Sequence, residues 1–162
     1  MKTDPLARAL LATWKRHDQI LLYLLQRVPE KQMGALPFGS GGRDVARVFA
    51  HLDRVRRGWL HFHATGERPE LPRAAKGERP KMKELSAALR ASGKDVGDLL
   101  GRALRGEARV RLFGQSPARW MGYLIAHESH HRGQIALALK QSGHALNEKA
   151  AHDLWGKWMF GK

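Results

Sequence analysis

The chain has 162 residues, of which 29 are Lys or Arg, 15 are Asp or Glu, nine are His and none is Cys. We expect residues 1–162 to form one domain, which at this length buries roughly two-thirds of the surface of the unfolded chain. The lack of Cys excludes disulfides, thiolate metal ligands and a cysteine nucleophile. Basic residues interrupt the apolar stretch near the start, and no run approaches the roughly 18 apolar residues of a membrane span. These features predict a soluble cytoplasmic protein.

The formal net charge of +14 bears on solubility, on the attraction of anions and on loose nucleic-acid binding, but not on the fold. Basic residues are densest in segments 54–57, 68–83 and 102–111. None of these segments is interleaved with aromatic residues, as a surface that stacks bases would be. We therefore interpret most of this charge as a solvated face.

Apolar residues recur with helical periodicity through most of the chain. The first predicted helix spans residues 6–28, with Asp4 as its N-cap and Pro5 in its first turn. A loop over residues 37–42 separates it from a second helix, expected over residues 43–63. The inward side chains of this second helix are Val45, Val48, Leu52, Val55, Trp59 and Phe62.

A connection rich in Pro, Gly and charge follows over residues 64–80 and has no apolar period. Such a length is typical of a functional or a mobile loop. The third helix is predicted over residues 81–104, although each of its glycines costs about 1 kcal/mol relative to Ala and together they favour a bend. These glycines are Gly93, Gly97 and Gly101.

The last third of the chain begins with a short connection, expected to be extended over residues 110–113 and to end at Gly114. The fourth helix then starts with Ser116 as N-cap and Pro117 in the first turn, and Gly143 terminates it. A short final helix is expected over residues 147–160, and no segment has a convincing strand pattern. The sequence thus predicts an all-α protein, a bundle of four antiparallel helices with a short C-terminal helix.

The most informative residues for function are His127 and His131, one turn apart at the centre of the apolar stripe of the fourth helix. Two imidazoles at this spacing can bind one metal ion. In an apolar stripe they must be neutral, hydrogen-bonded or metal-bound, because unpaired polar groups are costly there. A third ligand has to come from another helix. His51 on the second helix is the best placed, although taken alone it is more often a hydrogen-bonded core residue.

The other histidines are weaker candidates. His17 lies on the core face of the first helix, and a hydrogen-bonded core residue is favoured over a fourth ligand. His130 lies at the edge of the stripe. His63 lies at a helix end, and the sequence does not decide between a buried and an exposed position for it. The remaining three are expected at the surface: His61, His144 and His152.

Four further positions near the candidate ligands need an interpretation. Glu128 and His130 are weak candidates for proton transfer, and for Glu128 a solvated carboxylate is favoured. Gln134 points inward and either orients a ligand or makes an ordinary buried hydrogen bond. Gly133 is unusual inside a helix, and close helix packing is its simplest explanation.

The tryptophans expected in the core are Trp14, Trp59 and Trp120.

Two segments carry a family likeness. Residues 127–135 read H-E-S-H-H-R-G-Q-I and are followed by L-K-Q-S-G at 139–143, while residues 48–52 read V-F-A-H-L, with Trp59 further on. The first resembles the signature helix of the DinB/YfiT-like family and the second resembles that family's second-helix motif. The likeness extends over essentially the whole domain and is weakest over residues 64–115.

The resemblance implies a four-helix bundle, often a homodimer, with three histidines around a divalent metal. Carried over to this chain, the ligands are His51, His127 and His131. Nickel or zinc is the metal expected first, with manganese or iron as further possibilities. Relatives of this kind include thiol-dependent S-transferases and a mycothiol-dependent isomerase.

Three hypotheses follow. The first is a metal-dependent enzyme, of thiol-dependent S-transferase or hydrolase type, whose three His ligands leave a coordination position open. Its basic composition fits a low-molecular-weight thiol or another anionic small molecule. The second is a non-enzymatic basic module that binds nucleic acid through its phosphates. The third is an inactive metal-binding scaffold, in which the five Trp and the tail helix support a dimer.

Overall fold

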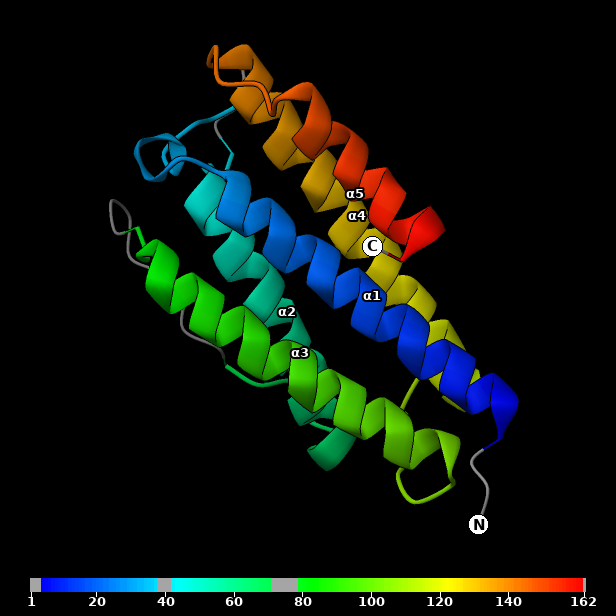
Figure 1. Cartoon of the computed structure of the whole chain (residues 1–162). Coiled ribbons are helices and arrows are strands. Elements are labelled where there is room, and N and C mark those ends of the chain that lie inside the picture. The colour runs from blue at the N-terminus through cyan, green and yellow to red at the C-terminus, as the bar shows by residue number, and fades with distance from the viewer. Residues whose placement is uncertain (1–3, 38–41, 71–78, 162) are drawn as a thin grey trace.

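The computed structural model describes residues 4–37, 42–70 and 79–161. Within these ranges helices are the only regular secondary structure, and every long helix predicted from the sequence is present to within two residues at each end (Figure 1). The helices are α1 (Pro5–Arg27), α2 (Val45–Thr65), α3 (Met82–Leu104), α4 (Pro117–Gln141) and α5 (Glu148–Phe160), with short 3-10 turns η1 (Glu30–Gln32) and η2 (Phe113–Gln115).

Short polar side chains set where the helices begin. The carboxylate of Asp4 accepts the N–H of Leu6 at 3.2 Å, and the Ser116 hydroxyl accepts the N–H of Arg119 at 3.3 Å. Each satisfies a donor that the first turn of a helix leaves without a partner. Gly143 follows α4 with a φ of 77°, the left-handed conformation typical of a residue that ends a helix. These caps therefore sit at the residues predicted from the sequence.

The direction of α3 differs from the prediction. Figure 1 shows α2 and α3 running the same way, and Arg79, just before α3, donates a hydrogen bond at 2.8 Å to Asp44, the N-cap of α2. Both helices therefore begin at the same end of the bundle. The connection between them is long enough to return along the 21 residues of α2, because an extended chain covers about 3.3 Å per residue and a helix about 1.5 Å. The predicted antiparallel arrangement is therefore wrong for α2 and α3, which run parallel to each other.

Two of the predicted loops lie partly outside the described residues. Residues 38–41 of the loop before α2, and residues 71–78 of the connection before α3, are among those that the structure does not describe. The prediction that residues 64–80 form a functional or mobile loop therefore lies partly outside the described residues, as does part of the basic segment 68–83.

The connection before α4 is extended only in part. Leu112 and Phe113 have φ values of 58° and 50°, and the 3-10 turn η2 starts at Phe113. A non-glycine residue in this conformation is strained, and tertiary contacts must hold it. The ring of Phe113 packs against Trp59 and Tyr123, with centroids 4.8 Å and 5.3 Å apart. This aromatic packing explains why the backbone leaves the extended form predicted there.

The core has two apolar clusters, one at each end of the bundle. Trp14 and Trp120 are buried, as predicted, whereas Trp59 is half-buried. The cluster near the start of α2 includes Leu21, Phe49, Leu52, Leu89 and Ile135. The cluster near the start of α4 includes Trp14, Val96, Leu100, Trp120 and Leu124.

A buried polar layer separates the two clusters and has Arg56 at its centre. The Nε and Nη2 of Arg56 donate to the two carboxylate oxygens of Glu128 on α4 at 2.7 Å and 2.8 Å. Its Nη1 donates to Asp18 on α1 at 2.8 Å and to the carbonyl of Leu89 on α3 at 3.1 Å. Glu128 also bonds the Nε2 of His17 on α1 at 2.7 Å. One guanidinium on α2 thus connects all four long helices.

The burial of Arg56 and Glu128 corrects two expectations. Their side chains are 0% and 1% exposed, whereas the sequence had placed the basic segment 54–57 and Glu128 in solvent. Burial raises the pKa of Glu128, but Arg56 and His17 reverse this effect and lower it to about 2. Burial lowers the pKa of Arg56, while Glu128 and Asp18 raise it above its ordinary value. Both groups are charged at neutral pH, and His17 is a buried, hydrogen-bonded residue as expected.

The helical glycines have contrasting surroundings. α3 runs continuously through its three glycines, so the predicted bend is absent. At Gly93 an added Cβ would overlap the carboxylate of Asp18, while the Gly93 carbonyl accepts a hydrogen bond from the indole of Trp14 at 2.9 Å. Gly133 on α4 is exposed, and an added Cβ would meet nothing within 4 Å. The prediction of close packing at Gly133 is therefore wrong. The close packing is found at Gly93 instead.

Replacing each of these two glycines with Ala should have opposite effects on stability. Gly133→Ala should raise the free energy of unfolding by about 0.5–1 kcal/mol, because a helical Ala loses less backbone entropy than Gly. Gly93→Ala should lower it by about 1–3 kcal/mol, because the methyl group displaces Asp18. Urea unfolding followed by circular dichroism measures both. Equal changes in the two variants would contradict the packing described for Gly93.

Removing the charge of Glu128 should destabilise the protein strongly, and the effect should depend on pH. Glu128→Gln leaves the buried Arg56 with one carboxylate partner among the described residues, Asp18, and should lower the free energy of unfolding by about 3–5 kcal/mol near neutral pH. Since the pKa of Glu128 falls from 4.5 to about 2 on folding, its contribution is complete above pH 4.5 and disappears as the pH falls through about 2. The difference between wild type and variant, measured by urea unfolding, should shrink over that range.

The control for this variant is Glu107→Gln. Glu107 pairs with Arg105 at the surface, at 2.7 Å, and the two side chains are 52% and 49% exposed. Exposed pairs contribute little to stability, so this change should have little effect at any pH. Similar losses from Glu107→Gln and Glu128→Gln would show that the buried network has no special importance.

Candidate metal centre

Three histidines from two helices meet beside the polar layer. His51 on α2 and His127 and His131 on α4 each offer a ring nitrogen, and these atoms all lie within 4.8 Å of one another. The ring centroids are 4.6 Å apart for His127 and His131, and 4.8 Å and 5.3 Å from His51 to His131 and His127. The sequence predicted this set of three, and the structure brings it together.

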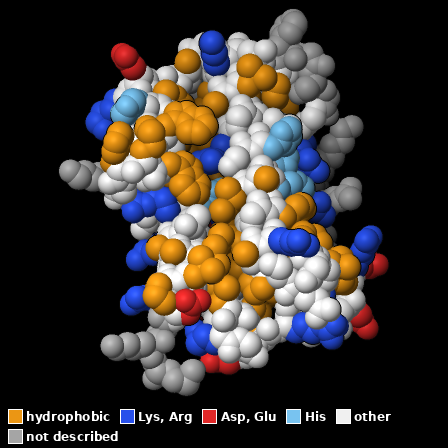
Figure 2. Space-filling model, turned by 90° about the vertical axis from the view of Figure 1, so that its right-hand side faces the viewer, with side chains coloured by type: hydrophobic (Ala, Val, Ile, Leu, Met, Phe, Trp, Pro, Cys, Tyr) orange, Lys and Arg blue, Asp and Glu red, His pale blue; other side chains and the backbone are white. Residues whose placement is uncertain are grey.

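The cluster is reachable from solvent. The side chain of His131 is 7% exposed, while His51 and His127 are half-buried. Figure 2 shows histidine side chains reaching the molecular surface. The cluster is therefore not closed off on all sides, as a structural metal site would be.

The polar layer holds the two helices in position at this point. His127 and His131 lie on either side of Glu128 in the sequence of α4, and His51 precedes Arg56 by five residues on α2. The two hydrogen bonds between Arg56 and Glu128 therefore fix how α2 and α4 meet next to the histidines. The spacing of the three rings depends on this contact.

The geometry fits a metal ion. The Nε2 atoms of His127 and His131 are 3.2 Å apart, and two nitrogens each about 2.0–2.1 Å from one tetrahedral ion are separated by about 3.3 Å. The Nδ1 of His131 donates to the amide oxygen of Gln134 at 2.7 Å, so its Nε2 carries the free lone pair. Gln134 thus orients His131, one of the two interpretations offered by the sequence.

Further evidence comes from a buried ring nitrogen without a partner. Among the described residues, the Nδ1 of His51 is buried and makes no hydrogen bond. Buried polar atoms in folded proteins nearly always have a partner. A nitrogen of this kind beside two other imidazoles is consistent with a site that takes a further group.

All three imidazoles are neutral at physiological pH. Burial lowers the pKa of His51 to about 3, with further contributions from Arg43 and from the other two rings. Burial is also the main cause that lowers the pKa of His127 and of His131. Neutral rings keep the lone pairs that metal ligation needs.

Two residues that the sequence did not single out border the cluster. The ring of Tyr123 stacks on His127, with centroids 5.9 Å apart and planes at 18°. The charge of Arg43 acts on all three histidines. Tyr123 precedes His127 by one helical turn, a spacing that indicates a shared face. Arg43 had no such signal, because its effect on the α4 histidines depends on how the start of α2 is placed against α4.

The other candidates lie outside the cluster. His130 is exposed, and its Nε2 accepts a hydrogen bond from the Gln134 amide at 2.9 Å. The solvated carboxylate expected at Glu128 is instead buried, with both oxygens engaged by Arg56 and His17. His63 is 4% exposed, and its Nδ1 accepts the backbone N–H of Arg111 at 3.1 Å. The three histidines expected at the surface are exposed: His61, His144 and His152.

Comparison with known proteins agrees with this geometry. No helix in the described ranges is long and apolar enough to cross a membrane. A search of curated proteins finds no match to the sequence. A protein-family model described as the DinB family matches residues 1–149, which include all four long helices and the three clustered histidines. The chain belongs to the DinB family.

Proposed function

We propose that the protein is a divalent-metal-dependent enzyme, of thiol-dependent S-transferase or hydrolase type, whose metal ligands are His51, His127 and His131. The observation that carries the proposal is the convergence of three neutral imidazoles at a position reachable from solvent. Three protein ligands with a remaining open position are the pattern of catalytic metal sites, whereas structural sites use four. Family membership supports the metal and leaves the reaction to be tested.

The chain's own residues supply orientation around the site. Gln134 holds His131 with its Nε2 toward the cluster, and Tyr123 packs against the ring of His127. When bound, a divalent metal lowers the pKa of a coordinated water or thiol and so supplies a nucleophile near neutral pH. Imidazole ligands suit nickel and zinc, which we expect first, and also iron, while manganese prefers oxygen ligands.

The charge around the site favours an anionic substrate. Arg43 places a positive charge close enough to act on all three histidines, and the net charge of +14 attracts anions at longer range. A low-molecular-weight thiol, or another small anionic molecule, fits this environment. We assign proton transfer to His130, because its ring is exposed beside His131, with centroids 5.2 Å apart. Glu128 is excluded from that role by its burial and its two bonded oxygens.

Metal analysis tests the site directly. The wild-type chain, purified without a His-tag and loaded with nickel or zinc, should hold about one ion per chain. His51→Ala and His131→Ala should each lose that ion while circular dichroism stays helical. His61→Ala, an exposed histidine on the same helix as His51, is the matched control and should keep the full amount.

The outcomes separate the three hypotheses. Full metal content in both ligand variants would disprove the site assignment. Metal binding with no turnover of thiol or ester substrates would instead indicate an inactive scaffold. A basic nucleic-acid-binding module would show DNA binding that falls steeply with salt and survives removal of the metal.

We further propose that the protein is a homodimer that associates through α5. Three large apolar side chains on α5 are among the most exposed of the described residues: Trp155 and Phe160 are each 68% exposed and Met159 is 64% exposed. Figure 2 shows orange side chains gathered at the surface over the C-terminal helix. Large apolar side chains that lie together at the surface of a protein mark sites where it associates with another molecule.

Light scattering after size-exclusion chromatography tests the dimer. The wild-type chain should elute with twice the mass of a single chain, and Trp155→Glu combined with Phe160→Glu should give the monomer mass. Leu112→Glu is the control, because Leu112 is 59% exposed and lies away from α5. A monomeric wild type, or a dimer unaffected by the α5 variant, would contradict the assignment.

A further inference from the structure

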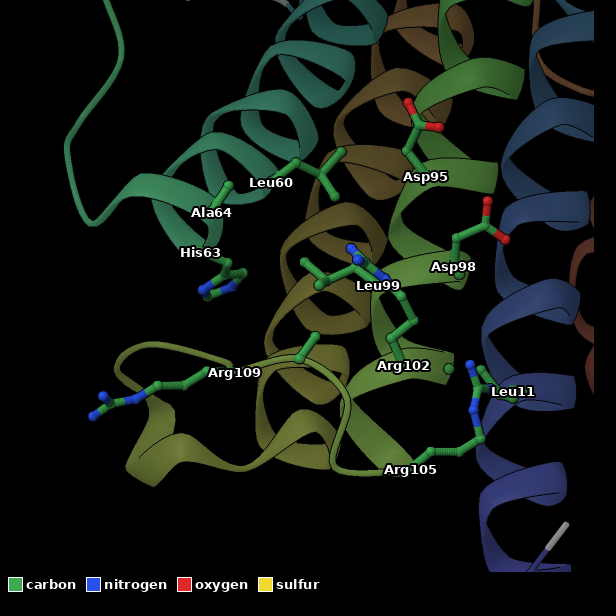
Figure 3. A pocket seen from close by; sticks show the side chains of 13 residues that line it. Leu11, Leu60, His63, Ala64, Asp95, Asp98, Leu99, Arg102, Arg105 and Arg109 are labelled. Atoms are coloured by element: carbon green, nitrogen blue, oxygen red, sulfur yellow. The ribbon is translucent and has the colours of Figure 1, made fainter. Parts of the chain in front are cut away.

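A cavity lies at the far end of the bundle from the start of α2. It has a volume of about 940 Å³, within the range of small-molecule sites, and is formed by α1, the last turns of α2 and α3, and the connection after α3. Its apolar wall includes Leu11, Leu60 and Leu99 (Figure 3). A site of this kind can hold the apolar body of a ligand.

The cavity is distinct from the metal centre. His63 lines it and follows His51 by twelve residues on the same helix, which places the two about 18 Å apart along α2. None of the three clustered histidines lines it. A ligand in this cavity therefore does not contact the metal site.

Arginine side chains dominate the polar part of the cavity. Figure 3 shows Arg102 reaching into the space between α2 and α3, Arg105 extending toward Leu11, and Arg109 pointing outward at the rim. Arg105 is bonded to Glu107 at 2.7 Å and 2.8 Å. The guanidinium of Arg102 donates no hydrogen bond within the described ranges, so all its donors are available to a ligand.

The free donors of Arg102 are not needed to cap the C-terminal ends of α2 or α3. Carbonyls in the last turn of α3, those of Gly101, Arg102 and Ala103, accept N–H groups from the backbone that follows the helix. The carbonyl of His63 in α2 accepts the Nε of Arg111 at 3.2 Å. Since these carbonyls have partners, Arg102 is not required as a C-terminal cap.

The acidic side chains at the cavity do not neutralise it. Asp98 is bonded to Lys94 at 2.6 Å, and Figure 3 shows the carboxylates of Asp95 and Asp98 lying on the side of the cavity toward α1 and the start of α3. With the partners Lys94 and Glu107 included, four positive side chains face three carboxylates, which leaves one positive charge in excess. An anion is therefore favoured over a cation in this space.

A buried histidine adds a hydrogen-bond donor. The Nδ1 of His63 accepts the backbone N–H of Arg111, so in the neutral ring the hydrogen is on Nε2. This Nε2 is buried and has no partner among the described residues, although His63 is only 4% exposed and lines the cavity. Buried donors in folded proteins nearly always have an acceptor. Since this atom is itself shielded, an acceptor of a ligand satisfies it only when the ring turns toward the cavity.

We propose that this cavity binds a small organic anion, with its phosphate or carboxylate group on Arg102 and its apolar body against Leu11, Leu60 and Leu99. Phosphate and carboxylate groups match the fork of donors that a guanidinium presents. The apolar wall selects an anion that carries a hydrocarbon or aromatic group over an inorganic one.

Calorimetric titration with phenyl phosphate tests the proposal. The full chain should bind one molecule in a saturable manner, and phenol, which has the same ring without the charge, should not bind. Arg102→Gln should weaken the binding of phenyl phosphate at least tenfold, because a charge-assisted pair of hydrogen bonds is lost. Arg90→Gln is the matched control, an exposed arginine on the same helix that does not line the cavity.

The His131→Ala variant separates this site from the metal centre. It should bind phenyl phosphate with the affinity of the wild type, whatever its metal content. Loss of binding in His131→Ala would place the anion at the metal centre and overturn the proposal. Equal weakening by Arg102→Gln and Arg90→Gln, or no saturable binding to either the wild type or the control, would overturn it as well.

Discussion

The buried guanidinium of Arg56 is the contact on which the bundle depends. Removing a guanidinium and a carboxylate from water costs several kcal/mol for each ion, and only complete hydrogen bonding in good geometry offsets that cost. Arg56 reaches Asp18, Leu89 and Glu128 on three different helices. Apolar clusters above and below this layer tolerate many packings, but a shift of any helix by one turn would leave a buried charge without its partner. The layer therefore selects one register for all four helices.

The metal centre takes its geometry from that register. Glu128 lies between His127 and His131 in the sequence, and Arg56 lies beyond His51 on the facing helix, so the same helix pair carries both the ion pair and the three imidazoles. Within one helix the i and i+4 spacing places His127 and His131 together. The third imidazole comes from a different helix, and only the contact between α2 and α4 brings it close. The polar layer and the histidine cluster form one continuous band across the bundle.

Sequence periodicity predicted the helices, their caps and the three clustered histidines, because all of these are properties of single helices or of their apolar faces. It failed where the answer depends on which helices are neighbours. Glu128 lies at the edge of its own apolar stripe, and it is buried because Arg56 approaches that edge from α2. The same limit applies to the direction of α3, since a long connection rich in Pro and Gly permits either direction. Gly133 was explained by packing that the structure instead shows at Gly93.

The contact between Gly93 and Asp18 has a consequence for how the sequence can change. The space next to the Cα of Gly93 is filled by the carboxylate of Asp18, and that carboxylate is held in place by Arg56. A side chain at position 93 is compatible with this core only if position 18 becomes smaller or turns away, and Arg56 then needs another acceptor. Positions 18, 56 and 93 should therefore covary among related chains, with a residue larger than Gly at 93 accompanied by the loss of Asp at 18.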